Sequence, residues 1–383
     1  MMSKMNIAIY PYIDECSVFS DNVDMLSDKY AFSEAASPRS WGFSGQKITT
    51  SFGEDTIKMS PSEFKKENDI LLIPDIKLVA GAEKGIVREI VAYIPLVKKV
   101  FYCGNMTKMS KEKIVEACNI NGCEFEDIKN SKDNEKLEIY YQNLRRYIDS
   151  SRHQKNVKTL SPCSVPIVAV SGEWESTDKF PIQLKLLRSL RKNGYKVSMI
   201  GSNVLSIFFG VHKFPSIMTD TEISEFDKPN LMSRYIYNIS EEEKPDIFII
   251  GVPGSAQAYN SIETNNFGIL PYITFQAMEV DYLIFTTLYR EGASEVLKEL
   301  TNMCYYKYGI APDTIHMTNV ELNQSEFYND TIVINHVKRE LVDVLIDVEY
   351  SDNPLIENLM NDDVIQDITE RIICKLSSTS VAI

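Results

Sequence analysis

Short apolar runs alternate with stretches of helical periodicity along the first 150 residues. The runs are typical of buried strands, whereas the periodic stretches repeat an apolar residue every three or four positions. The pattern predicts strands over 6–10, 69–74 and 99–103 and helices over 85–97, 111–119 and 135–148. Alternating strands and helices are the signature of a parallel sheet covered by helices. Residues 1–150 are therefore predicted to form a Rossmann-like or flavodoxin-like α/β domain.

A polar, proline-containing stretch separates this series from a second one. Residues 151–166 carry Ser, Arg, His, Gln, Lys and Asn with little apolar periodicity, which predicts a linker. The expected strands beyond it are 167–171, 196–200, 246–252, 282–287, 313–318 and 331–334, and the expected helices are 181–193, 293–306, 336–346 and 364–376. The sequence thus predicts a second α/β domain, residues 167–383, with a mainly parallel sheet.

The first domain lacks the signature of a dinucleotide site. Its first strand runs into Pro11 and Tyr12, with none of the glycines that let a backbone approach a pyrophosphate. A loop over residues 37–47 combines Trp41 with glycines, serines and cations. Two interpretations of this loop stay open: a contact surface, or a tryptophan that plugs the sheet end.

The loop after the first strand of the second domain has the architecture of a phosphate loop. Gly172 stands at the strand end, and Lys179 follows seven positions later at the start of an amphipathic helix. In such loops backbone N–H groups and the helix N-terminus converge on an anion while the lysine contacts phosphate oxygens. Candidate ligand-binding residues are Gly172, Ser176, Thr177, Asp178 and Lys179. The alternative is a structural turn in which Thr177 or Asp178 caps the helix.

The loop departs from a Walker A motif in ways that bear on hydrolysis. It is one residue longer, Asp178 stands where the second glycine belongs, and Phe180 replaces the hydroxyl residue that binds Mg²⁺. Glu173, Glu175 and Asp178 add negative charge. The sequence therefore predicts a degenerate P-loop-NTPase-like domain without efficient NTP hydrolysis. No cofactor is assigned, but a nucleotide or another phosphate-containing ligand fits the motif.

A second loop follows the strand predicted over residues 246–252. The end of this strand and the loop after it hold Gly251, Gly254 and Ser255, whereas a Walker B strand would end in an acidic residue. Carboxyl ends of parallel strands share one edge, so this open backbone is expected to face the same cleft. Ordinary turn chemistry is the alternative.

Composition and charge restrict the partners. The 383 residues are 44% apolar, enough for two cores, and the formal net charge is −14. This acidity argues against a nucleic-acid partner, whose phosphates need clustered Lys and Arg. The longest apolar runs are far shorter than the ~20 residues that cross a bilayer, and no secretory signal pattern opens the chain. A cytoplasmic location is expected, without a membrane partner.

Cysteines and histidines offer no catalytic or metal-binding pattern. The seven cysteines include no Cys-x-x-Cys pair, which predicts reduced thiols and no metal site. The four histidines are scattered, and no nucleophile elbow accompanies them. The catalytic residues, if any exist, stay unassigned.

The motifs together resemble a known family. The residues from Gly172 to Lys179, the stretch 194–202, the stretch 208–215, the loop 251–254 and the Ser40-Trp41-Gly42 loop are similar to peptide maturation system proteins of clostridial natural-product clusters. The resemblance covers nearly the whole chain. It implies partners encoded beside such proteins: a Cys-rich, bacteriocin-type precursor peptide and a radical SAM maturase. More distantly, the two halves resemble Rossmann plus P-loop proteins, namely D-amino-acid N-acyltransferases and dethiobiotin synthetase-like ATPases.

Three hypotheses for function follow. The leading one is an accessory protein that binds the precursor peptide, the maturase or both, with Trp41 and Trp174 as candidate contacts because tryptophan is enriched in binding hot spots. The second is an ATP-dependent ligase or acyltransferase acting on an amino acid or peptide at the second domain's cleft. The third is a nucleotide sensor using the same pocket. Self-association into a homo-oligomer is compatible with each.

Overall fold

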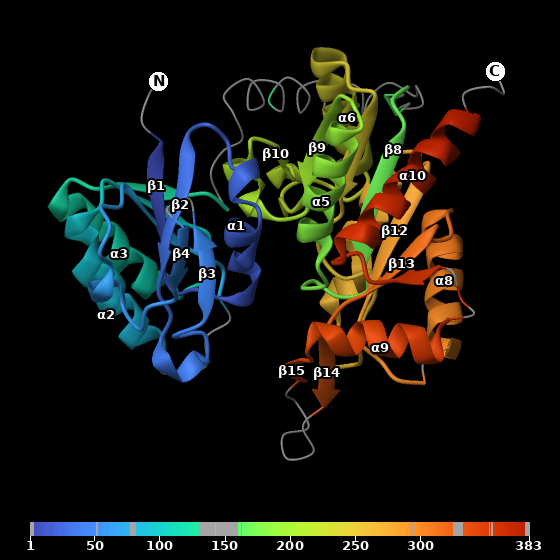
Figure 1. Ribbon diagram of the computed structural model, residues 1–383. Helices are drawn as coiled ribbons and strands as arrows, with labels where there is room; N and C mark the ends of the chain where they lie inside the picture. The colour runs from blue at the N-terminus through green and yellow to red at the C-terminus, as the bar shows by residue number, and fades with distance from the viewer. Residues whose placement is uncertain are drawn as a thin grey trace. The chain divides into compact units, whose positions relative to one another are not determined.

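A computed structural model describes residues 4–50, 53–76, 82–129, 142, 160–161, 163–292, 294–324, 332–351, 353 and 355–379. The chain divides into two compact units (Figure 1). The first comprises residues 1–132 with Ile207–Gly210, and the second comprises residues 133–206 with 211–383. All of the predicted helix over 135–148 except residue 142, and most of the predicted linker over 151–166, lie outside the described residues.

A five-stranded parallel sheet forms the first unit, in the order β2-β1-β5-β6-β7. Its strands are β1 (Met5–Ile9), β2 (Tyr30–Ala35), β5 (Ile70–Ile73), β6 (Lys99–Tyr102) and β7 (Glu124–Asp127). Its α-helices are α1 (Ser17–Asp21), α2 (Glu83–Tyr93) and α3 (Lys108–Asn121), and β3 (Lys47–Thr50) pairs antiparallel with β4 (Gly53–Thr56). The strand order is the flavodoxin-like one, which decides between the two predicted topologies.

A seven-stranded parallel sheet forms the second unit, in the order β10-β9-β11-β8-β12-β13-β16. Its strands are β8 (Ile167–Gly172), β9 (Val197–Gly201), β10 (His212–Lys213), β11 (Ile247–Gly251), β12 (Tyr282–Thr287), β13 (Thr314–Met317) and β16 (Ile356–Glu357). The predicted strand over 331–334 is instead part of a separate antiparallel hairpin, β14 (Val320–Gln324) with β15 (Ile332–His336). The mainly parallel α/β fold predicted for both halves is confirmed.

Six α-helices accompany the second sheet in the described part of the chain. They are α5 (Lys179–Lys192), α6 (Lys228–Glu243), α7 (Ile269–Phe275), α8 (Ser294–Tyr308), α9 (Arg339–Glu349) and α10 (Asp362–Thr379). Figure 1 shows α5 and α10 side by side, and the Ser189 hydroxyl of α5 donates to Gln366 of α10 at 3.2 Å. Every residue of β8 and β11 is buried. Such continuous burial is typical of parallel strands covered on both faces.

Candidate functional site

The strand order places the loop after β8 at the centre of the second sheet. β8 lies between β11 and β12. The chain leaves β8 through α5 toward β9 on one side, whereas β12 and β13 lie on the other side. Such a reversal of strand order opens a crevice at the carboxyl ends of the strands, where α/β proteins bind ligands. Residues 173–178 occupy that position.

Asp178 supplies the backbone conformation that the loop needs before its helix. Its φ is 58°, in the left-handed region, and α5 begins at the next residue, Lys179. A Walker A loop has glycine at this position, and aspartate is among the few other residues that tolerate the conformation. The side chain of Asp178 makes no capping bond to α5. Thr177 bonds to Trp174 and Thr286, so neither predicted cap forms.

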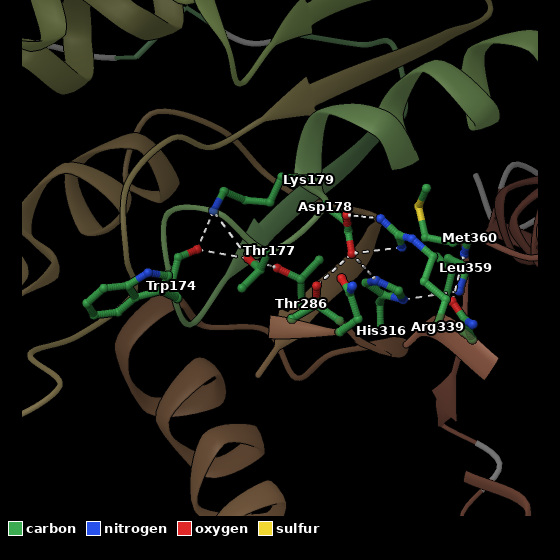
Figure 2. A network of polar contacts seen from close by, with 12 residues as sticks. Trp174, Thr177, Asp178, Lys179, Thr286, His316, Arg339, Leu359 and Met360 are labelled. Carbon is green, nitrogen blue, oxygen red and sulfur yellow. Dashed lines mark hydrogen bonds and ion pairs between the residues drawn. The ribbon is translucent and has the colours of Figure 1, made fainter. Parts of the chain in front are cut away.

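Lys179 is turned inward onto its own loop (Figure 2). Its ammonium donates to the carbonyls of Trp174 at 2.5 Å and Glu175 at 2.8 Å, and to the Thr177 hydroxyl at 3.4 Å. Burial lowers the pKa of Lys179 to about 8, although Glu175 and Asp178 oppose the shift. No hydrogen bond to another described residue engages the N–H groups of Glu175, Thr177 or Lys179. The loop therefore combines a buried cation with unused backbone donors.

The Asp178 carboxylate points away from Lys179 into a separate polar cluster (Figure 2). It accepts from Thr318 at 2.6 Å, from His316 Nε2 at 3.2 Å and from Arg339 Nη2 at 3.2 Å. Burial opposes its ionisation, but these donors and the Arg339 charge hold the pKa of Asp178 well below its usual range. His316 Nδ1 accepts from the Leu359 N–H at 3.1 Å, so Nε2 carries the proton that faces Asp178.

Glu173 is neutralised by Arg290, which corrects the expectation that three carboxylates crowd the loop. The Arg290 guanidinium forms a bidentate pair with this carboxylate, with Nη1 to Oε2 at 2.7 Å. The Thr287 hydroxyl also donates to it at 2.8 Å. Since Asp178 is likewise paired, only Glu175 is left exposed with its charge. Repulsion of an anion is therefore weaker than the sequence suggests.

Glycine at position 172 is required by close packing. A Cβ there would lie 2.0 Å from the Thr286 hydroxyl oxygen and 2.7 Å from that of Thr177. These two hydroxyls are themselves 2.5 Å apart and link β12 to the loop.

Among the described residues no group of three or more His, Cys, Asp or Glu side chains is arranged to hold a metal. Ser176 is partly exposed on the same loop and Thr177 is fully buried.

The loop after β11 lies against the loop after β8, and the first of its two glycines, Gly251, is covered by a side chain. The Ala256 N–H donates to the Gly172 carbonyl at 2.9 Å. A Cβ on Gly251 would lie 2.1 Å from Oε1 of Gln183, whose side chain covers this glycine. Gly254 has a φ of 81°, as a turn requires, and Ser255 is buried. The predicted adjacency of the two loops holds, whereas Gly251 serves packing against Gln183.

Trp174 is a core residue, so the expectation that it contacts a partner is wrong. Its side chain is 4% exposed and packs with Leu288, Val320 and Leu322. Its ring also meets Tyr259 edge-on, with centroids 5.7 Å apart. Trp41 ends a short 3-10 helix, Arg39–Trp41, and packs partly buried against the first unit's core. The two interpretations of the Trp41 loop therefore stay open.

Several residues of the site carry no sequence signal that would have identified them. Thr286, His316, Thr318 and Arg339 come from β12, the end of β13 and the start of α9. They lie 109 to 161 positions from the loop residue that each contacts, Thr177 or Asp178, and no motif spacing connects them. Of these four residues, only His316 has a residue type that points to a polar site, because a buried histidine needs polar partners.

The fold and the loop define a class: a two-unit, parallel α/β protein with a phosphate-loop-shaped turn that lacks the usual hydroxyl and glycine. No protein-family model matches the sequence, nor does any curated protein. A solved structure of a DUF1611 family protein from Anabaena variabilis has a similar fold, with a TM-score of 0.57 and 11% identity over 96% of this chain and 100% of that one.

A second solved structure, a UDP-N-acetylmuramoyl-L-alanyl-D-glutamate–2,6-diaminopimelate ligase, aligns with a TM-score of 0.23 and 7% identity, over 73% of this chain and 53% of that one. A TM-score this low does not indicate a shared fold. The first similarity establishes the two-unit α/β fold and nothing about chemistry.

No helix in the described part of the chain is long and apolar enough to span a membrane. None of the seven cysteines, all of which the structure describes, forms a disulfide.

Proposed function

We propose that the second unit binds a phosphate-containing ligand, such as a nucleotide, in the β8–α5 loop without hydrolysing it efficiently. The observation that carries this proposal is the left-handed Asp178 directly before the buried ammonium of Lys179. This arrangement gives the loop the backbone course of a phosphate loop although the glycine is missing. Unused N–H groups and the N-terminus of α5 add favourable electrostatics for an anion.

Two features speak against efficient hydrolysis. Phe180 is 4% exposed and offers no hydroxyl for Mg²⁺. β11 ends in Gly251, covered by Gln183, where a metal-holding carboxylate would otherwise stand. The ligase or acyltransferase alternative needs a metal-bound nucleotide or an activated acyl donor, and no feature of the loop favours it over binding alone.

In the cell, we place this ligand-binding unit in an accessory protein for maturation of a ribosomally made, Cys-rich peptide. The support is the sequence resemblance to peptide maturation system proteins, with the precursor peptide and a radical SAM maturase as partners. The strongly acidic chain suits a cationic partner, because opposite charges accelerate and orient association.

Binding of tripolyphosphate and ATP to the purified protein tests the loop. Both are expected to bind wild-type protein, and Lys179→Ala should weaken binding at least tenfold because the loop loses its cation. Lys192→Ala, an exposed lysine in the last turn of the same helix, is the matched control and should bind normally. ATP turnover at ordinary ATPase rates, lost in Lys179→Ala, would support the enzyme alternative.

The pH dependence of this binding follows from the lowered pKa of Lys179. The ammonium is protonated below about 8 and neutral above it. Tripolyphosphate affinity should therefore fall as pH rises from about 7 to about 9.5, approaching about tenfold per pH unit at the upper end. Calorimetry at constant ionic strength measures it. An affinity that does not change over this pH range would show that the Lys179 ammonium does not contact the ligand.

A further inference from the structure

Magnesium in an ordinary phosphate loop is held by two kinds of protein oxygen. One is a hydroxyl directly after the loop lysine, and the other is a carboxylate at the end of a neighbouring strand. In this chain Phe180 takes the first position and is 4% exposed. One of its ring carbons lies 3.1 Å from the point where a Cβ on Gly201 would stand, so the ring packs against the end of β9. The hydroxyl position is therefore filled by a buried hydrocarbon ring.

The carboxylate position is filled by an amide whose polar atoms already have partners. β11 ends at Gly251, and a Cβ there would lie 2.1 Å from Oε1 of Gln183. This oxygen accepts from the Ser202 N–H at 2.8 Å, and the Gln183 nitrogen donates to the Ile200 carbonyl at 2.9 Å. Gln183 thus occupies the end of β11 without presenting a charged oxygen to a metal.

Two carboxylates of the loop are engaged by arginines. Both oxygens of Glu173 accept from Arg290, and one of them also accepts from Thr287. Both oxygens of Asp178 accept from Arg339, at 3.2 and 3.5 Å. Either carboxylate could bind a metal only after it released its arginine. Glu175, which is exposed, is the one loop carboxylate left for that purpose.

The groups that remain for a phosphate are a cation and N–H donors. The ammonium of Lys179 and the unused N–H groups of Glu175, Thr177 and Lys179 lie on one loop. At pH 7 the loop and its partners carry three cations, on Lys179, Arg290 and Arg339, and three carboxylates, on Glu173, Glu175 and Asp178. These six charges sum to zero without an added metal ion. A phosphate oxygen that coordinates Mg²⁺ has less negative charge to offer an N–H donor, so the loop favours oxygens that are not shared with a metal.

We propose that the β8–α5 loop binds its ligand as a free phosphate or diphosphate ester rather than as a magnesium complex. The ligand class is therefore a phosphomonoester or a metal-free nucleoside diphosphate, and the loop anchors this group without activating its P–O bonds. The proposal rests on the phosphate-binding function proposed above. It adds that Mg²⁺ competes with the loop for the phosphate oxygens.

Calorimetry with ADP, in excess EDTA and in saturating Mg²⁺, tests this competition. We expect ADP to bind at least fivefold tighter in EDTA. Electron paramagnetic resonance gives an independent readout with Mn²⁺ in place of Mg²⁺: protein added to a Mn²⁺–ADP mixture should raise the signal of hydrated Mn²⁺, because it withdraws ADP from the complex.

The possible failures are distinguishable. Equal or tighter ADP binding in Mg²⁺, or a fall in the hydrated Mn²⁺ signal, would overturn the proposal and leave phosphate binding itself intact. If neither ADP nor tripolyphosphate binds in either buffer, this proposal and the phosphate-binding function are both wrong.

Glu175→Gln tests the remaining carboxylate. The variant should bind ADP at least twofold tighter in EDTA at low ionic strength, because the loop no longer repels the anion through this side chain. Glu241→Gln, an exposed carboxylate in the last turn of α6, is the matched control and should bind ADP as wild type does. A loss of affinity in Glu175→Gln that is confined to the Mg²⁺ buffer would show that Glu175 holds the metal, and would overturn the proposal.

Discussion

Asp178 shows how a single residue combines a backbone role with a side-chain role. Its left-handed φ turns the chain into α5, and its carboxylate joins the loop to His316, Thr318 and Arg339. Glycine would satisfy the backbone but would remove the acceptor that these three donors share. Aspartate therefore adopts the backbone conformation that glycine would adopt, and its carboxylate also links the loop to β13 and α9 through hydrogen bonds and an ion pair.

Substitution of Asp178 should separate the two roles. Asp178→Ala is expected to destabilise the protein by about 2–3 kcal/mol, because alanine is strained at this φ and leaves buried donors unpaired. Asp178→Asn keeps the tolerated backbone and an acceptor oxygen, so about 1 kcal/mol is expected. Urea denaturation near pH 7 measures both. Equal losses for the two variants would contradict this account.

The pKa of Asp178 sets the pH range in which its carboxylate stabilises the folded protein. Because the folded-state pKa lies below the usual value near about 4, the carboxylate stabilises the fold fully above that pH and progressively less as the pH falls below it. The stability difference between wild type and Asp178→Asn should therefore narrow under acid. A difference that grows with acidification would mean that the carboxylate is not the stabilising form.

At the level of elements, Gln183 connects α5 to two strands. Its amide donates to the Ile200 carbonyl of β9 at 2.9 Å and accepts from the Ser202 N–H at 2.8 Å. The same side chain covers Gly251 at the end of β11. The position of the helix that begins with Lys179 is thus fixed by a polar link that needs a glycine opposite it.

A double-mutant cycle tests this link. Gly251→Ala should cost about 1–3 kcal/mol, because its Cβ would overlap the Gln183 amide. Gln183→Ala should cost about 1–3 kcal/mol, because Ile200 and Ser202 lose their partner. The double variant should be less destabilised than the sum of the two, since the overlap disappears with the glutamine. Strict additivity, measured by urea denaturation, would show that the two residues do not interact.

At the level of the whole molecule, the accessory role proposed above requires a binding partner, and the net charge of −14 favours a cationic one. Trp41 is the remaining tryptophan with exposed surface, on a loop of the first unit. Trp41→Ala should weaken association with the precursor peptide or the maturase by at least ~1 kcal/mol. Calorimetry with each purified partner measures this, and Trp174→Phe is the control because Trp174 is buried. If neither partner binds the wild-type protein, the accessory role is wrong.

Much of the fold follows from local patterns in the sequence. The apolar runs at Ile167–Gly172 and Ile247–Gly251 identify central strands because both faces must be buried, and the periodicity after Lys179 identifies α5. The strands β2 and β7 and the helix α6 were not predicted. The edge strand β7 is only partly covered, and its sequence, Glu-Phe-Glu-Asp, contains no apolar run. β2 is buried at all but its first residue, but the buried polar residues Ser33 and Glu34 interrupt its apolar run. The β8–α5 loop was predictable from Gly172 and Lys179 because a phosphate-loop motif is defined by residue types at fixed spacing.

Only the tertiary structure decided what those residues contact. Trp174 looked like a surface residue because its neighbours in sequence are charged, but Glu173 is paired with Arg290, 117 positions away, and the indole fills a core. The partners of Asp178 likewise arrive through the order of strands in the sheet. Sequence by itself determined the periodicity of the elements and the spacing of the loop, since both are local. Burial and charge pairing depend on which strands become neighbours, and that is a property of the folded chain.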